Sequence, residues 1–240
     1  QYQQLIAEAN GGAEGIVTGS VKDAFTQSPL QGVKLKISKE SLYYGETQSE
    51  SDGQFSIAAP ACDGLVAEFT KEGYIPITYH NINVTINNET YLEPVLQIDN
   101  SHSGNGSISG TIYNAIDGSA IAGCNLDIRN GINATQGTVI ASAISNNNGT
   151  YLIQNLPAGN YTIHCYKNGF TESFFTALCL GGQLINNQNG TMTPVLNDDE
   201  IRIVLTWGDS PSDLDSHLTG PADGDNRFHV FFASSDYYQS

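Results

Sequence analysis

The sequence is poor in basic residues, methionine and tryptophan, and it has no long apolar run. Only nine lysines and arginines stand against 25 aspartates and glutamates, so the formal net charge at neutral pH is −16. Proteins that bind nucleic acid need clustered basic side chains against the phosphates, so this charge argues against a nucleic-acid partner. No apolar run approaches the roughly 18 residues of a membrane-spanning helix. We therefore expect a chain that does not span a membrane.

Helical periodicity is also missing, because no long segment carries apolar residues at positions i, i+3, i+4 and i+7. The 25 glycines and 39% hydrophobic residues are typical of an all-β protein with many turns. Residues 148–170 show the pattern most clearly, since Tyr151 and Ile153 alternate with outward-facing neighbours. Proline and glycine in 156–160 predict a turn there, and a second alternating strand begins at Tyr161.

Two stretches of the chain repeat one pattern in the same order. The matched segments are 15–19 with 106–110, 32–37 with 123–128, 52–57 with 148–153, 71–74 with 167–170, and 94–96 with 194–196. In the second of these pairs, alternation predicts one inward face formed by Val33, Leu35 and Ile37 and by their counterparts Cys124, Leu126 and Ile128. Ordered matches over this length indicate tandem copies of one domain. Each copy offers about seven short strands, enough for a two-sheet sandwich with its own core.

After the second copy the pattern changes. Residues 200–207 alternate strictly and predict a strand, 208–218 read as a loop, and 227–232 predict a second strand. Two strands cannot bury their own apolar side chains, so another segment must complete this module. We predict the following division: 1–14, an N-terminal extension and possible donor strand; 15–98, the first β-sandwich; 99–105, a polar linker; 106–198, the second β-sandwich; 199–240, part of a third β-sandwich module.

The repeated pattern resembles a known family. Gly-x-Val/Ile-x-Gly, then Gly-Val/Cys-x-Leu-x-Ile, Asp/Asn-Gly-x-Phe/Tyr-x-Ile and Lys-x-Gly-Phe/Tyr are similar to carboxypeptidase regulatory-like domains over residues 15–198. The resemblance implies tandem Ig-like or transthyretin-like β-sandwiches, and such modules serve as spacers, stabilisers and binding domains. The run at 206–218, T-W-G-x-x-P-x-D-L-D-x-H-L, resembles the opening of another β-sandwich family of secreted and surface proteins. The module combination with its many Asn-x-Ser/Thr triplets resembles the protomers of glycosylated fibrils from natural waters.

The Asn-x-Ser/Thr triplets, or sequons, are the strongest functional signal. They occur at Asn83, Asn88, Asn105, Asn133, Asn148, Asn160 and Asn189. This is about twice the number expected by chance, so accidental sequons in asparagine-rich turns are an alternative. Several fall in predicted turns or in the linker, where a glycan fits. We expect several of the seven to carry N-linked sugar.

The cysteines also suggest an extracellular address, because disulfides persist outside the cytosol. Cys62, Cys124, Cys165 and Cys179 form an even set without Cys-x-x-Cys spacing, which argues against a zinc site. A Cys124–Cys165 bridge, leaving Cys62 with Cys179, is one pairing and Cys165–Cys179 is its rival. Four buried free thiols are the further alternative.

The candidate metal site is an acidic loop. Alternating Asp213 and Asp215 can offer hard oxygens to Ca²⁺, with three further carboxylates nearby in sequence. These three are Asp209, Asp223 and Asp225. Capping of the loop's own backbone is the competing role for such aspartates. His217 and His229 lack a third nitrogen ligand and are expected to be structural.

No enzyme motif is present: the chain has no Gly-x-Ser-x-Gly, His-Glu-x-x-His or Ser-x-x-Lys pattern and no phosphate-binding glycine loop. We expect a non-enzyme with no required cofactor. Three functions remain. The first is the subunit of an extracellular glycosylated fibre or surface filament, polymerising with itself head to tail by strand addition. The second is a surface adhesin or calcium-dependent carbohydrate-binding protein. The third is the accessory β-sandwich region of a longer secreted enzyme.

Overall fold

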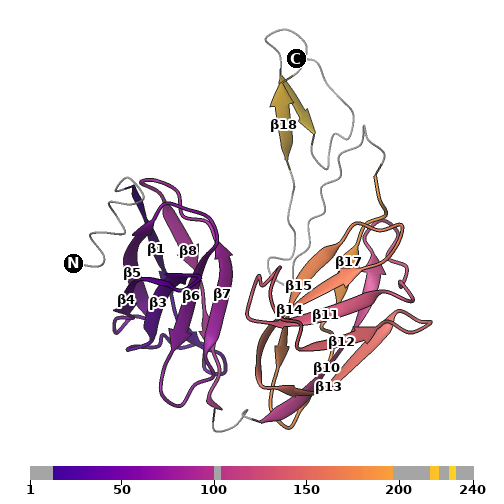
Figure 1. Cartoon of the computed structure of the whole chain (residues 1–240), viewed down its shortest axis with the longest axis horizontal. Coiled ribbons are helices and arrows are strands. Elements are labelled where there is room, and N and C mark those ends of the chain that lie inside the picture. The colour runs from indigo at the N-terminus through magenta and orange to yellow at the C-terminus, as the bar shows by residue number, and fades with distance from the viewer. Residues whose placement is uncertain (1–12, 100–103, 197–216, 222–226, 231–240) are drawn as a thin grey trace. The chain divides into compact units, whose positions relative to one another are not determined.

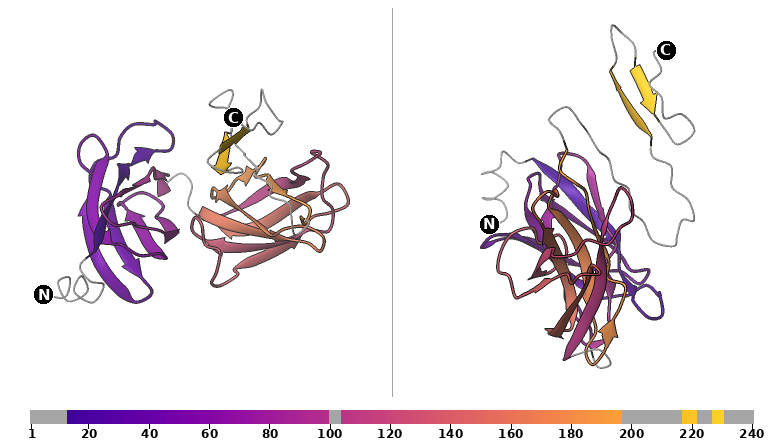
Figure 2. Two further views of the ribbon diagram at one scale, coloured as in Figure 1. Left: turned by 90° about the horizontal axis from the view of Figure 1, so that it is seen from above. Right: turned by 90° about the vertical axis from the view of Figure 1, so that its right-hand side faces the viewer.

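The computed structural model describes residues 13–99, 104–196, 217–221 and 227–230. Every element that it bounds in these ranges is a β-strand, from β1 to β19 (Figure 1). The chain divides into two compact units, Gln1–Val195 and Leu196–Ser240. The first unit contains both repeats, each folded as a sandwich of its own (Figure 2). The predicted all-β class is confirmed.

The first repeat folds into two principal sheets that enclose one core. Their strand orders are β5-β1-β8 and β4-β3-β6-β7, and β2 pairs separately with β9. The strands are β1 (Glu14–Ser20), β2 (Lys22–Asp23), β3 (Lys34–Lys39), β4 (Leu42–Gln48), β5 (Gln54–Pro60), β6 (Leu65–Thr70), β7 (Ile77–Ile82), β8 (Glu89–Leu92) and β9 (Val95–Leu96). Along β3, Leu35 and Ile37 are buried and Lys34 and Lys36 are exposed, as the two-residue period of a strand requires.

The second repeat has the same strand order. Its sheets are β13-β10-β16, with β17 also paired to β10, and β12-β11-β14-β15. The strands are β10 (Asn105–Asn114), β11 (Asn125–Asn130), β12 (Ala141–Ile144), β13 (Thr150–Pro157), β14 (Gly159–Tyr166), β15 (Ser173–Cys179), β16 (Leu184–Ile185) and β17 (Gly190–Met192). Tandem copies of one sandwich are therefore present, while the exact domain boundaries stay predictions.

The repeated Gly-x-Val/Ile-x-Gly motif has a steric cause. A Cβ atom on Gly19 would lie 1.8 Å from the carbonyl oxygen of Leu92. A Cβ on Gly110 would lie 2.1 Å from that of Gln188. In each copy the first strand passes a neighbouring backbone so closely that only glycine fits.

Each core also contains one buried serine in the same place. The Ser49 hydroxyl accepts a hydrogen bond from Val33 N at 2.9 Å and donates to Leu30 O at 2.6 Å. Ser145 repeats both bonds in the second sandwich, at 2.9 and 2.7 Å. Both hydroxyls are almost fully buried, so each bond satisfies a backbone group that water does not reach.

The predicted inward residues of the two copies are all buried. They are Val33, Leu35 and Ile37 in the first copy and Cys124, Leu126 and Ile128 in the second. Two separate hydrophobic clusters result, one in each sandwich. The inward alternation of Tyr151 and Ile153 in β13 is likewise confirmed.

The turn predicted at 156–160 is wrong in its extent. β13 continues through Pro157, and β14 already begins at Gly159. Pro157 is tolerated because β13 is an edge strand of its sheet and ends at this residue. The two strands also belong to different sheets, so the connection passes from one layer of the sandwich to the other and is no hairpin.

In the second unit the structure describes one hairpin. β18 (Leu218–Pro221) pairs antiparallel with β19 (Arg227–Val230). β19 falls within the predicted strand at 227–232, whereas β18 was not predicted and begins at the end of the expected loop. The predicted strand at 200–207 lies outside the described residues.

Candidate functional site

Six of the seven sequon asparagines are exposed. These six are Asn83, Asn88, Asn105, Asn133, Asn148 and Asn189, and Asn160 is half-buried. The exposed ones lie in turns or at the ends of strands, where an attached sugar meets little of the folded chain. Sugar occupancy of the seven sequons stays a prediction.

The exposed sequon at Asn148 makes its side-chain hydrogen bonds within itself. Its Oδ1 accepts hydrogen bonds from the backbone nitrogen of Thr150 at 3.2 Å and from the Thr150 hydroxyl at 2.8 Å. These bonds form an Asx turn, which turns the asparagine side chain back onto its own sequon. The Nδ2 atom to which a sugar would be attached makes no hydrogen bond in the described part of the chain.

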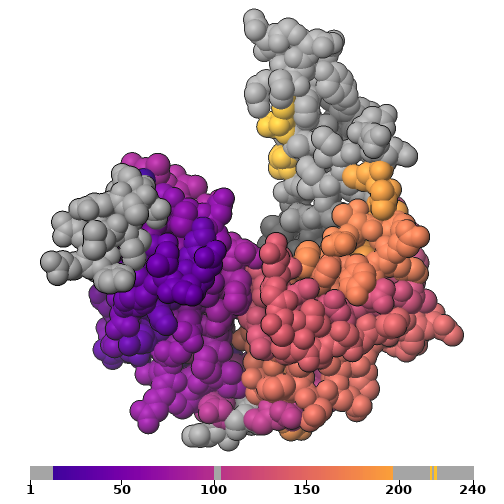
Figure 3. Space-filling model, in the orientation of Figure 1, coloured from indigo at the N-terminus to yellow at the C-terminus, as the bar shows by residue number. Residues whose placement is uncertain are grey.

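The sequon at Asn133 lies in a contact between the repeats that we call the joint, formed by residues 131–135 and β7. Ile132 N donates to Thr78 O and His80 N donates to Ile132 O, both at 2.8 Å. The loop thereby adds a short parallel bridge to the edge of β7. The Ile132 side chain packs against the core of the first sandwich. Figure 3 shows the outer surface of the first sandwich in indigo and purple and that of the second in pink and orange.

Side-chain amides reinforce the joint. Asn81 Nδ2 donates to Asn133 O at 2.7 Å and to Thr135 Oγ1 at 2.9 Å. Asn133 Nδ2 donates to His80 O at 3.2 Å. The atom that would carry a glycan at Asn133 is therefore engaged in the joint, unlike that of Asn148.

Gly131 permits the close approach. Its φ is +91°, and a Cβ there would lie 2.7 Å from Cδ2 of His80. The imidazole is packed tightly enough that burial lowers the pKa of His80 below its ordinary value.

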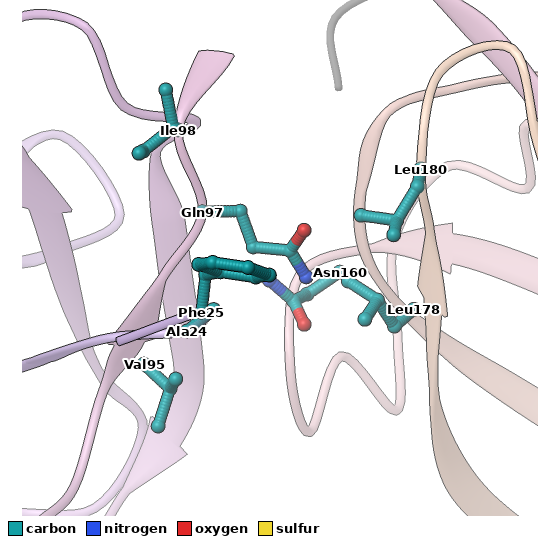
Figure 4. Close-up of a pocket in the computed structure, with 8 residues that line it drawn as sticks. All are labelled: Ala24, Phe25, Val95, Gln97, Ile98, Asn160, Leu178 and Leu180. Carbon is teal, nitrogen blue, oxygen red and sulfur yellow. The ribbon is translucent and has the colours of Figure 1, made fainter. Parts of the chain in front are cut away.

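A cavity of about 730 Å³ lies beside the half-buried sequon (Figure 4). Its lining residues are Ala24, Phe25, Val95, Gln97 and Ile98 from the first sandwich and Asn160, Leu178 and Leu180 from the second. In Figure 4 Phe25 and Val95 lie opposite Leu178 and Leu180, with the side-chain amides of Gln97 and Asn160 between them. The lining is mostly apolar with two amides, a composition common to small-molecule sites.

All four cysteines are free thiols in the structure, so no predicted disulfide is formed in it. Cys124 and Cys165 are nevertheless buried neighbours in the second core, where the Cys124 thiol also contacts Met192 Sδ at 3.3 Å. The neighbouring Cys124 thiol and burial raise the pKa of the Cys165 thiol. Cys179 instead donates to Leu156 O at 3.3 Å, and Cys62 packs on the first core. Of the pairings that the sequence left open, the geometry favours Cys124 with Cys165.

The predicted calcium ligands lie outside the described residues. This holds for Asp209, Asp213, Asp215, Asp223 and Asp225. Elsewhere in the described ranges, no three acidic, histidine or cysteine side chains gather as a metal site would require. Calcium binding stays a prediction. Among the same residues there is also no helix of the length and hydropathy that crossing a bilayer requires.

Sequence reasoning missed both the joint and the cavity. A signal for the joint exists in the repeat comparison, because the connection from Asn130 to Ala141 is long whereas Lys39 and Leu42 are joined by a tight turn. This insertion supplies Ile132. No comparable feature of the sequence indicated the cavity, because its walls come from both repeats.

Comparisons with known proteins agree with the fold of the second repeat. Residues 107–192 match the model of the carboxypeptidase regulatory-like domain, which confirms the predicted resemblance there. A search of curated proteins gave no match.

Solved structures give three examples of more distant similarity. The TIE protein of Bacillus anthracis is 16% identical, with 75% of this chain and 34% of that chain covered and a TM-score of 0.32. The shaft pilin SpaA of Lactobacillus rhamnosus GG is 12% identical, with 77% and 98% covered and a TM-score of 0.29. GBS52, the minor pilin of Streptococcus agalactiae, is 9% identical, with 79% and 100% covered and a TM-score of 0.31. The chain spans about a third of the TIE protein. At these TM-scores the similarities carry no functional argument.

Proposed function

We propose that this chain is a non-catalytic structural subunit of an extracellular glycosylated fibre or surface filament, and that subunits join head to tail by strand addition. The observation that carries the proposal is the β18–β19 hairpin. In the part of the chain that the structure describes, each of these strands pairs only with the other. A two-stranded sheet is marginally stable in water, so a further strand paired with β18 or β19 would stabilise it.

The rest of the described chain suits a structural subunit. Each sandwich has its own closed core, and the joint links the two through backbone hydrogen bonds and Ile132. Exposed sequons on both sandwiches offer sites for a glycan coat. The net charge of −16 favours a soluble surface.

Strand addition joins two chains when an extended segment of one pairs with an open edge of the other. A contact between different surfaces that does not close on itself produces a filament. The N-terminal residues 1–12, with their apolar Leu5, Ile6 and Ala7, are the donor segment that we propose.

A peptide experiment tests this assignment directly. A chain lacking residues 1–12 should stay monomeric and should bind a synthetic peptide of residues 1–12 at a one-to-one ratio. A control peptide with Leu5 and Ile6 replaced by serine should not bind. Failure of the unaltered peptide to bind would contradict the donor mechanism, and calorimetric titration measures both cases.

A further inference from the structure

The cavity beside Asn160 lies at a sequon whose asparagine side chain has no hydrogen-bond partner among the described residues. The sequon is Asn160-Tyr161-Thr162, and Asn160 is the second residue of β14, opposite Leu178 of β15. The backbone oxygen of Asn160 accepts from Gly131 N at 2.9 Å. Its side-chain amide makes no hydrogen bond among the described residues, although the residue is half-buried against apolar walls. The Nδ2 atom of Asn160 is therefore unengaged at the edge of the cavity and open to attachment of a sugar.

The opposite wall supplies what a sugar needs. Phe25 is 88% exposed, which is unusual for a phenylalanine in a folded domain and leaves its ring face open to the cavity. The C–H face of a pyranose ring packs on aromatic faces, and its hydroxyls bond to amides. Gln97 provides a second amide in the lining whose side chain makes no hydrogen bond within the described ranges. A volume of about 730 Å³ lies in the range of small-molecule pockets.

We propose that Asn160 carries an N-linked glycan whose first sugars occupy this cavity and stack on Phe25. The inference rests on the proposed glycosylation of the chain and names one site and its protein contacts. Attachment forms a bond between Asn160 Nδ2 and the anomeric carbon of the sugar. It breaks the bond from that carbon to the phosphate of an activated glycosyl diphosphate donor, and it releases the amide proton and the diphosphate.

The third residue of the sequon, Thr162, determines whether the sugar is attached before or after the sandwich folds. Thr162 is 1% exposed, and its hydroxyl donates to Gly131 O and accepts from Ala134 N, both at 2.8 Å. A transferase that reads this hydroxyl cannot reach it in the folded sandwich. The sugar is therefore added before β14 joins its sheet, and the chain then folds around it. The exposed sequon at Asn148 has no such constraint.

Mild periodate oxidation of the native full chain, followed by glycopeptide mass spectrometry, tests the proposal for any glycan with vicinal diols. We expect sugar on Asn160, and we expect its inner residues to be oxidised about tenfold more slowly than those at the exposed sequons, because the cavity walls exclude the reagent. The variant Phe25→Ala should remove most of this protection. Since Phe25 is exposed, the variant should fold normally. Tyr91→Ala, which removes another exposed aromatic ring away from the cavity, is the matched control and should leave the protection unchanged.

Each contrary result has a distinct meaning. Glycans at the exposed sequons with none on Asn160 would overturn this inference and leave the glycoprotein proposal intact. Equal oxidation rates for the glycans at all sites would contradict the proposal that the sugar lies in the cavity. Full protection of the Asn160 glycan in Phe25→Ala would contradict it as well. The absence of sugar from every sequon would overturn both proposals.

Discussion

The amide nitrogen of His80 donates a 2.8 Å hydrogen bond to the carbonyl oxygen of Ile132, a residue of the other repeat. This bond and its partner from Ile132 N to Thr78 O cover part of the edge of β7. Uncovered edges pair readily with other chains, so the joint both links the sandwiches and protects an edge.

Replacing Ile132 with alanine should loosen the joint without unfolding either sandwich. Ile132 packs on the first core only in part, so the expected cost is about 1–2 kcal/mol, below that of a fully buried isoleucine. Hydrogen exchange at the His80 amide should become faster while exchange in β3 stays unchanged. Ile116→Ala, at a 57% exposed position, is the control. Unchanged exchange at His80 in the Ile132 variant would show that this contact does not hold the joint.

Gly131→Ala should open the joint by a steric clash. The added methyl would lie 2.7 Å from Cδ2 of His80, at a φ of +91° that disfavours alanine. Gly137→Ala is matched in backbone strain, with a φ of +102°, but its methyl would meet nothing within 4 Å. We expect faster exchange at His80 in the first variant and not in the second. If both variants speeded exchange at His80 equally, backbone strain alone, and not the clash with His80, would explain the faster exchange.

The joint should weaken in mild acid. Burial lowers the pKa of His80 below its ordinary value of 6.5, so an opened joint binds a proton more readily than the closed one. Stability is therefore full above pH 6.5 and decreases as the pH falls from 6.5 toward the lowered pKa. Exchange at the Ile132 amide, corrected for its intrinsic pH dependence, should show more opening at about pH 5.5 than at about pH 7.5. His80→Gln should remove the difference, and a difference that persists in this variant would assign the effect to another group.

Each of the two buried serines should contribute a similar amount to the unfolding free energy of the sandwich that contains it. Ser49→Ala leaves Val33 N and Leu30 O without their partner, and Ser145→Ala does the same to Cys124 N and Ile121 O. Each loss should cost about 1–3 kcal/mol of unfolding free energy, the penalty for buried unsatisfied groups. Denaturant unfolding followed by hydrogen exchange should place each loss in the sandwich that contains the variant. Losses below a few tenths of a kcal/mol would mean that water replaces the hydroxyl.

Oxidation of the purified chain should join Cys124 to Cys165 first. Their thiols are buried neighbours in one core, whereas Cys179 donates to Leu156 and Cys62 packs in the other sandwich. Peptide mapping without reduction identifies the pairs. A bridge from Cys62 to Cys179, or from Cys165 to Cys179, would contradict this geometry.

The sequence predicted the features that depend on local pattern. Alternation placed Leu35, Leu126 and Tyr151 on the inward faces, and the ordered repeats predicted two sandwiches, as observed. It misjudged the connection at Pro157, because proline is compatible with the end of an edge strand as well as with a turn. The joint and the cavity could not be read from local pattern, since each depends on residues more than 50 positions apart, such as His80 and Asn133.

The most direct test of the fibre proposal is the particle mass of the full chain beside that of the chain lacking residues 1–12. Light scattering and electron micrographs of both, before and after removal of any glycan, provide the comparison. The proposal predicts filaments for the full chain and monomers for the truncated one, with several glycan masses lost on deglycosylation. Monomers in both preparations, at the 25.7 kDa of the bare chain, would contradict the fibre and the glycan together. Filaments in both would retain the fibre and rule out the N-terminal donor.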